Sequence, residues 1–186
     1  VRCVEETDFE GVVNESSWGF KSPQPHHLNG PTAMRQDRFF IGMNPLRTEE
    51  IRMDKEHVFF ENYAKHWDRD RKENRTILSE FLRLMALKTG AAVLDAGCGT
   101  GVLLPYLAEA VGADGGVEGF DYSQQMIDVA KDKFASLANV TFTTGDVLKY
   151  HFEACRYDAV CCLNFYPHIA DHSRDVIRRL YDAVAP

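Results

Sequence analysis

Apolar runs and segments of helical periodicity alternate along the second half of the chain. Three mostly apolar runs have the character of buried strands and begin at Val93, Val117 and Tyr157, while 140–144 alternates apolar and polar residues. The intervening and final segments carry apolar residues at helical spacing, over 102–108, 123–137 and 171–184. Strands that alternate with helices in this way predict an α/β fold with a doubly wound, mostly parallel sheet.

Two further helices are predicted upstream of the first strand. The first carries an apolar, mainly aromatic stripe at helical spacing, made by Val58, Phe59, Phe60, Tyr63, Ala64 and Trp67. The second has one apolar face, made by Ile77, Leu78, Phe81, Leu82 and Met85. Gly90 suits the residue that ends this second helix. Packing of the aromatic stripe into the core is the simpler interpretation, and a helix that covers a ligand is the alternative.

The first 52 residues show neither strand nor helix periodicity, which predicts an irregular arm. The pair His26-His27 suggests a metal site, but further ligands are not close in the sequence, so solvated loop histidines are the simpler interpretation. Met43 and Met53 each precede sequence typical of a domain entrance, and one hypothesis places the native start at one of them. The chain thus divides into an arm (1–52), a helical cap (53–90) and an α/β core (91–186).

Composition and charge limit the class of protein. The 186 residues suffice for one domain with a hydrophobic core, and a net charge of −7 argues against a nucleic-acid partner. The five cysteines have no C-x-x-C spacing, and Cys161 and Cys162 lie in an apolar run, which favours buried thiols in a reducing compartment over disulfides or a metal site. No apolar stretch is long enough to span a membrane, so we expect a cytoplasmic protein without a membrane partner.

The strongest chemical signal is the stretch V-L-D-A-G-C-G-T-G at 93–101, where a strand reaches Asp95 and continues into three alternating glycines. Glycines let a backbone turn sharply and approach a nucleotide closely. The spacing departs from the dinucleotide fingerprint G-x-G-x-x-G, because Gly101 comes one residue early and Val102 holds the sixth position. Asp95 would repel a diphosphate, but it suits a cationic ligand such as a sulfonium that carries an ammonium group.

This stretch resembles motif I of the class I, Rossmann-like, S-adenosylmethionine-dependent methyltransferases, and the resemblance extends over residues 55–186. It implies that S-adenosylmethionine is the cofactor. It also implies which residues hold the methionine end of that cofactor, namely Asp95, Gly97, Cys98, Gly99 and Gly101.

The segment F-F-x-x-Y-A-x-x-W-D at 59–68 resembles the N-terminal cap of such methyltransferases. The resemblance implies that Tyr63 and Trp67 wall the cofactor or substrate pocket. Under this interpretation the aromatic stripe is the ligand-covering helix rather than part of the core.

An acid suited to ribose follows the second strand. Asp121 lies about twenty residues past the glycine loop, where a ribose-binding carboxylate belongs in nucleotide-binding sheets. The resemblance implies that Asp121 and its neighbour Tyr122 contact the cofactor. The alternative is that Asp121 only begins the turn before Ser123, the predicted N-cap of the next helix.

A second acid follows the strand at 140–144. The resemblance implies that Asp146 and Val147 recognise adenine, because a carboxylate accepts from the adenine amino group while a backbone N–H donates to the ring. The alternative is that Asp146 forms a simple Asx turn.

The last strand leads into N-F-Y-P-H at 164–168, on the side of the sheet where ligands bind in doubly wound folds. We expect Asn164 to meet the cofactor and His168 to face the substrate. The imidazole of His168 could act as a general base, but capping of the next turn is the simpler interpretation. No catalytic residue is therefore assigned. The segment is not the Asn-Pro-Pro-Tyr motif of amino-methylating DNA enzymes.

Four strand–helix units imply the strand order 3-2-1-4, whereas complete members of the resembled family add further strands. We therefore expect a truncated domain in which strand 157–163 is an exposed, unpaired edge that permits self-association.

The function predicted from the sequence is S-adenosylmethionine-dependent methyl transfer to a small-molecule acceptor. One alternative is a non-catalytic or truncated module that only binds S-adenosylmethionine. A second alternative is an NAD-dependent oxidoreductase, which the position of Asp95 and the glycine spacing disfavour.

Overall fold

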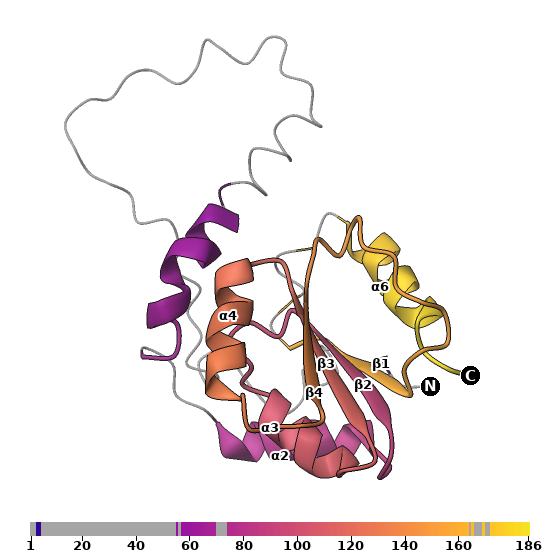
Figure 1. Ribbon diagram of the computed structural model, residues 1–186. Helices are drawn as coiled ribbons and strands as arrows, with labels where there is room; N and C mark the ends of the chain where they lie inside the picture. The colour runs from indigo at the N-terminus through magenta and orange to yellow at the C-terminus, as the bar shows by residue number, and fades with distance from the viewer. Residues whose placement is uncertain are drawn as a thin grey trace, which may run out of the picture.

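The computed structural model describes residues 55, 57–69, 74–163, 165, 169 and 172–186, together with the backbone of residues 3 and 4. In this part of the chain, parallel strands form one sheet in the order β1-β5-β2-β3-β4 (Figure 1). The strands are β1 (Cys3–Val4), β2 (Ala92–Ala96), β3 (Gly116–Asp121), β4 (Val140–Thr144) and β5 (Ala159–Cys161). The predicted order 3-2-1-4 is confirmed, because β4, β3, β2 and β5 follow one another across the sheet.

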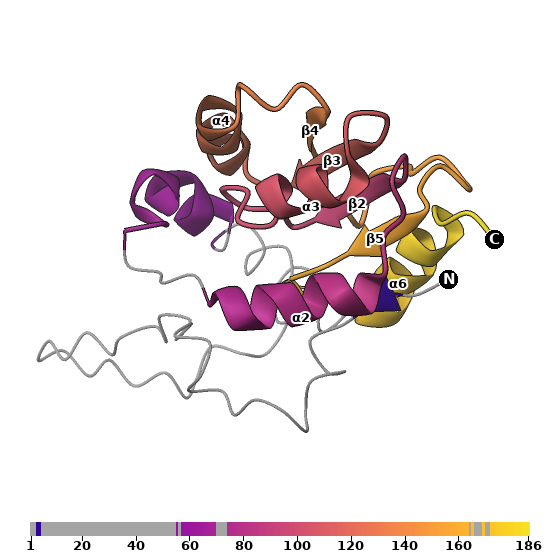
Figure 2. The same cartoon turned by 90° about the horizontal axis from the view of Figure 1, so that it is seen from below.

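Helices cover both faces of this sheet, as the continuous apolar strands predicted. They are α2 (Arg75–Met85), α3 (Leu104–Val111), α4 (Gln124–Lys133) and α6 (Ser173–Asp182). The first three pack on the face to which Val93 and Val117 contribute, and α6 packs on the face to which Leu94 and Phe120 contribute (Figure 2). The doubly wound α/β expectation is therefore confirmed.

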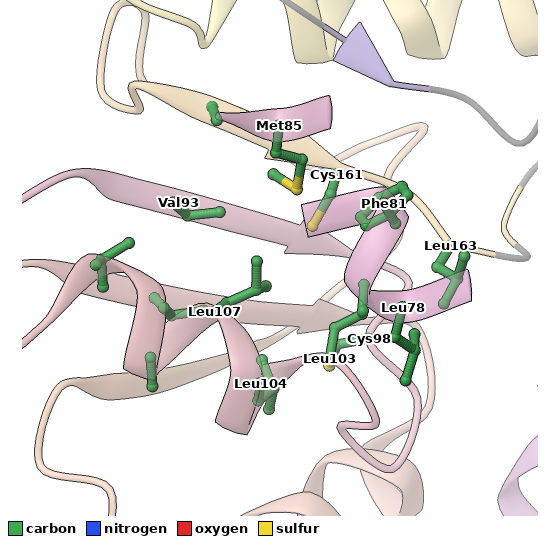
Figure 3. Close-up of a cluster of buried hydrophobic side chains, with 14 of the residues drawn as sticks. Leu78, Phe81, Met85, Val93, Cys98, Leu103, Leu104, Leu107, Cys161 and Leu163 are labelled. Atoms are coloured by element: carbon green, nitrogen blue, oxygen red, sulfur yellow. The ribbon is translucent and has the colours of Figure 1, made fainter. Parts of the chain in front are cut away.

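The larger core cluster lies between the strands and helices α2 and α3 (Figure 3). Leu104, Leu107 and Val111 of α3 have no exposed surface, and Phe81 of α2 is 1% exposed. Full burial of such a side chain stabilises the fold by about 1.5–3 kcal/mol. This packing fixes α3, and with it the glycine loop that leads into the helix.

Two helix starts lie where the sequence placed them. Pro105 is in the first turn of α3, where its missing N–H removes no helical hydrogen bond. Ser123 is the N-cap of α4, and its hydroxyl accepts a hydrogen bond from the amide of Met126 at 3.2 Å.

The end of α2 differs from the prediction. The helix stops at Met85, and Ala86 adopts the left-handed conformation that usually favours glycine (φ 49°). Gly90 (φ 87°) lies instead in the turn before β2, where its amide donates to the carbonyl of Val111 at 2.8 Å. The expectation that Gly90 ends this helix is wrong, because Ala86, a residue with a Cβ, ends it instead.

The expectation of an exposed, unpaired edge at strand 157–163 is wrong. The strand is shorter than predicted, and β1 pairs with it through Cys3 with Val160 and Val4 with Cys161. Val160 is only 1% exposed, because helices also cover both faces of the sheet. The proposed self-association through this strand therefore loses its structural basis.

β1 lies within the arm 1–52, for which the sequence predicted no regular structure. The rest of that arm, including His26, His27 and Met43, lies outside the described residues, as does Met53 at the start of the predicted cap. None of the helices in the described part of the chain is long and apolar enough to cross a membrane.

The inward face of α6 is narrower than predicted. Val176 and Leu180 are buried, with 0% and 2% of their surfaces exposed. Tyr181 continues the apolar spacing of the predicted helix 171–184, but it is 58% exposed.

Candidate cofactor site

The glycine loop between β2 and α3 folds back onto the end of β3. Its glycines all have positive φ, 77° at Gly97, 53° at Gly99 and 85° at Gly101, a conformation that residues with a Cβ rarely adopt. The amides of Gly97 and Cys98 both donate to the carbonyl of Phe120, at 2.7 and 3.0 Å. These bonds place the residues that follow β3 beside the loop.

Two of these glycines differ in what lies over them. A Cβ at Gly97 would lie 2.5 Å from the ring of Phe165, so this glycine is needed for packing. Over Gly99 the nearest atom to such a Cβ is the indole nitrogen of Trp67, at 3.8 Å. Of these two glycines, Gly99 is therefore the one that a ligand can approach among the described residues.

Alanine at Gly101 is expected to lower the free energy of unfolding by about 2 kcal/mol, because the positive φ is strained and the new Cβ would crowd its neighbours. The Cβ would lie 2.8 Å from the side chains of both Leu104 and Phe134. Gly116→Ala is the matched control, because a Cβ there meets no atom of the described residues within 4 Å. Urea denaturation of the two variants should separate them, and equal losses would contradict this explanation.

Asp95 lies beneath the loop with 1% of its surface exposed, and it accepts a hydrogen bond from the thiol of Cys161 at 3.5 Å. Burial raises the pKa of Asp95 to about 7, the Cys161 thiol opposes this shift, and the negative charge of Asp121 adds to it. The sequence placed this acid at the entrance of the loop, facing a cation. The structure places it inside the protein, so its charge would act on a ligand through the loop rather than by contact.

Asp95→Asn is expected to stabilise the protein more at pH 8 than at pH 5. Folding raises the pKa of Asp95 from 3.8 to about 7, so the bound proton favours folding below pH 3.8, and this contribution is lost as the pH rises to 7. Asparagine carries no charge to desolvate. The melting temperature should exceed that of the wild type by about 5 °C at pH 8 and by less than about 2 °C at pH 5. A difference that does not vary with pH in scanning calorimetry would contradict the assignment.

Asp121 ends β3 and connects two loops. Its Oδ2 accepts from the amide of Gly99 at 2.8 Å, and its Oδ1 accepts from the amide of Ser123 at 2.9 Å. The acid therefore begins the turn before α4, as the alternative interpretation held, and also anchors the glycine loop. A carboxylate has about four acceptor sites, so these two amides alone do not exhaust it.

Asp146 lies next to Asp121 at the edge of the sheet, because the amide of Gly145 donates to the carbonyl of Asp121 at 2.9 Å. Its Oδ1 accepts from the amide of Leu148 at 2.9 Å, which is the Asx turn that the sequence left as the alternative. Val147, the other expected adenine contact, is 6% exposed.

The second half of the chain, which carries this sheet and its glycine loop, matches a known protein family. The family model described as a methyltransferase domain matches residues 93–186. The chain belongs to this methyltransferase-domain family.

Individual relatives also match a part of this chain. The demethylmenaquinone methyltransferase of Staphylococcus aureus (strain MRSA252) is 34% identical over 109 residues, covering 56% of this chain and 45% of that protein. A SAM-dependent methyltransferase from Aquifex aeolicus has a TM-score of 0.53 at 27% identity, covering 59% of this chain and 58% of that chain. The chain thus spans about half the length of the curated relatives it matches.

Another solved structure that resembles the methyltransferase domain contains ligands. It is the Haemonchus contortus phosphoethanolamine N-methyltransferase 2 in complex with phosphomonomethylethanolamine and S-adenosylhomocysteine. Its TM-score is 0.54 at 28% identity, and the match covers 60% of this chain and 26% of that chain.

A cap helix precedes the methyltransferase domain and lies beside α4, in purple in Figure 1. It comprises residues 57–63 and the 3-10 turn η3 (Ala64–His66). The aromatic stripe does not pack uniformly into the core, since Ala64 is 2% exposed while Val58 is 56% exposed. Tyr63 is half-buried, and Trp67 reaches the glycine loop at Gly99. The default interpretation of the stripe as core is therefore wrong for its outer residues.

Sequence reasoning assigned no specific role to two residues at this edge of the methyltransferase domain. Phe165 packs on the glycine loop, whereas its neighbours Asn164 and His168 lie outside the described residues. His57 of the cap helix lies against Tyr122, with ring centroids 4.2 Å apart. Its buried Nδ1 has no hydrogen-bond partner among the described residues. No sequence spacing marked His57, because its contact depends on how the cap helix docks.

Proposed function

We propose that this chain binds S-adenosylmethionine at the carboxyl edge of its sheet and transfers the methyl group to a small-molecule acceptor. The observation that carries the proposal is the carboxylate of Asp121, which the amides of Gly99 and Ser123 hold in place beside the glycine loop. A carboxylate in that position can accept hydrogen bonds from both hydroxyls of a ribose.

The hydrogen bonds of the loop favour this cofactor over a dinucleotide. The amides of Gly97, Cys98, Gly99 and Gly101 all donate to acceptors within the protein. A diphosphate is bound by backbone amides that point toward it, and the loop has given these four amides to internal acceptors. This arrangement disfavours the alternative of an NAD-dependent oxidoreductase.

Two features of the described residues fit an adenosyl group. Among the described residues, the space that a Cβ at Gly99 would take is open apart from the indole nitrogen of Trp67 at 3.8 Å, and the buried Nδ1 of His57 beside Tyr122 lacks a partner. A buried polar atom of this kind is costly unless a ligand or water satisfies it. We assign the methionine end to the loop with Asp95, and the rest of the cofactor to Tyr63, Asp121, Tyr122, Asp146, Val147 and Asn164.

When bound, S-adenosylmethionine supplies an electrophilic methyl group on a sulfonium leaving group. The residues of the chain then have to orient the cofactor and exclude water. Asp121 fixes the ribose side relative to the glycine loop, and Trp67 covers the loop at Gly99. No catalytic base is needed for an acceptor that is already nucleophilic.

Incubation of the chain with radiolabelled S-adenosylmethionine and a panel of small quinol, phenol and amine acceptors tests the proposal. The similarity to a demethylmenaquinone methyltransferase and the net charge of −7 favour a small-molecule acceptor over nucleic acid. We expect label transfer to at least one acceptor. Because the chain covers 45% of that relative, binding without transfer to any acceptor would favour the alternative of a module that only binds the cofactor.

We also propose that the protein acts in the cytoplasm. Cys98, Cys155 and Cys161 are free thiols in the described part of the chain, as is usual in a reducing compartment. Fractionation of cells that express the tagged protein would test this proposal, and recovery from a secreted fraction would contradict it.

A further inference from the structure

Asp68 connects the end of the cap helix to the glycine loop. Its Oδ1 accepts from the hydroxyl of Thr100 at 2.6 Å, and its Oδ2 accepts from Nζ of Lys133 at 2.7 Å. The same lysine donates to the carbonyl of Thr100 at 2.9 Å. The three residues come from the cap, the glycine loop and the last turn of α4, so one carboxylate holds three separate segments together.

The middle and the start of the cap helix also dock beside α4. The carboxylate of Glu61 accepts from the amide of Gln125 at 3.3 Å, in the first turn of α4. His57 lies against Tyr122, just before that helix. The cap helix therefore lies along the length of α4, as Figure 1 shows, and Asp68 is the contact nearest to the loop.

Of the contacts that Asp68 makes, we expect the hydrogen bond from Thr100 to contribute most to docking. Thr100 is 3% exposed, and its buried hydroxyl would lose its acceptor without Asp68. The side chains of Lys133 and Asp68 are 36% and 49% exposed, so their ion pair is screened by water and contributes little on its own. The effect of Asp68 should therefore depend mainly on the hydroxyl at position 100.

We propose that Asp68 is a positioning residue that docks the cap helix on the glycine loop and thereby holds Trp67 over Gly99 as a wall of the cofactor site. The docking of Trp67 is a property of the ligand-free chain. Its consequence for the cofactor rests on the proposed function.

Tryptophan fluorescence of the full chain tests both parts. A Trp18→Phe background leaves Trp67 as the single tryptophan, since the chain has two. In this background, Asp68→Ala should raise the acrylamide quenching of Trp67 without ligand and weaken S-adenosylhomocysteine binding about tenfold. Asp132→Ala is the matched control, because its exposed carboxylate lies next to Lys133 but takes no part in these contacts.

A pair of variants at Thr100 separates positioning from general stability. Thr100→Val removes the hydroxyl and should reproduce both effects of Asp68→Ala, whereas Thr100→Ser keeps the hydroxyl and should restore the wild-type values. Unchanged quenching of Trp67 in folded Asp68→Ala and Thr100→Val would overturn the proposal. Increased quenching in these variants, with a wild type that does not bind S-adenosylhomocysteine, would support the docking and contradict the proposed function instead.

Discussion

Asp121→Ala is expected to weaken the binding of S-adenosylhomocysteine by about 100-fold or more. The substitution removes the proposed acceptor for the ribose hydroxyls. It also removes the acceptor for the amides of Gly99 and Ser123, at 2.8 and 2.9 Å, so both loops at the site lose their common anchor. Hydrogen bonds to a charged group contribute about 1.5–3 kcal/mol each, which sets the size of the expected effect. Isothermal titration calorimetry measures it.

The matched control for this variant is Asp114→Ala. Asp114 is exposed in the turn before β3, whereas Asp121 is the last residue of that strand. The two acids therefore lie at opposite ends of β3. Asp114→Ala should bind as the wild type does. A folded Asp121→Ala that binds S-adenosylhomocysteine with unchanged affinity would rule out Asp121 as the ribose anchor.

The second large effect is expected on stability, at Glu118 of β3. This residue is 6% exposed, and its carboxylate accepts from the hydroxyls of Thr143 and Tyr157 at 2.7 and 2.8 Å. Arg156 pairs with it at 2.8 Å but is 48% exposed, so that ion pair contributes little. Burial makes the largest contribution to raising the pKa of Tyr157, and the hydrogen bond and the charge of Glu118 raise it further. The Tyr157 hydroxyl therefore stays protonated and can donate.

Glu118→Ala should lower the free energy of unfolding by about 3 kcal/mol, because both hydroxyls lose their acceptor inside the protein. Glu118→Gln keeps an acceptor oxygen and should lose less. Glu109→Ala, at an exposed position of α3, should change stability by less than about 0.5 kcal/mol. Urea denaturation of the three variants gives the order, and a Glu118→Ala protein as stable as Glu109→Ala would show that the cluster does not stabilise the fold.

Most of the fold could be predicted from the sequence, because the core strands are long enough to show their pattern. The apolar run that starts at Val93 and the alternation over 140–144 each predict a strand. The share of apolar residues in each run also indicates how far that strand is buried. β1 could not be predicted in this way, since two residues carry no period and its pairing with β5 joins opposite ends of the chain. The end of α2 was missed because Ala86 adopts a conformation for which glycine is the usual signal.

The site was predictable only where local spacing determines it. The positions of Asp121 and the glycines follow from a strand, a turn and a helix that are contiguous in sequence, and the structure brings them together through the bond from Gly99. The burial of Asp95 depends on β5, and the contacts of Glu118 depend on residues from β4 and beyond. The same holds for Asp68, whose contact with Thr100 requires the cap helix to dock.

The most direct test of the account is a pair of titrations on the wild-type chain, with S-adenosylhomocysteine in one and NADH in the other, under the same buffer conditions. A glycine loop whose amides are already bonded internally, beside an anchored carboxylate, predicts saturable binding of S-adenosylhomocysteine and no measurable binding of NADH. Saturable binding of NADH together with no response to S-adenosylhomocysteine would contradict it.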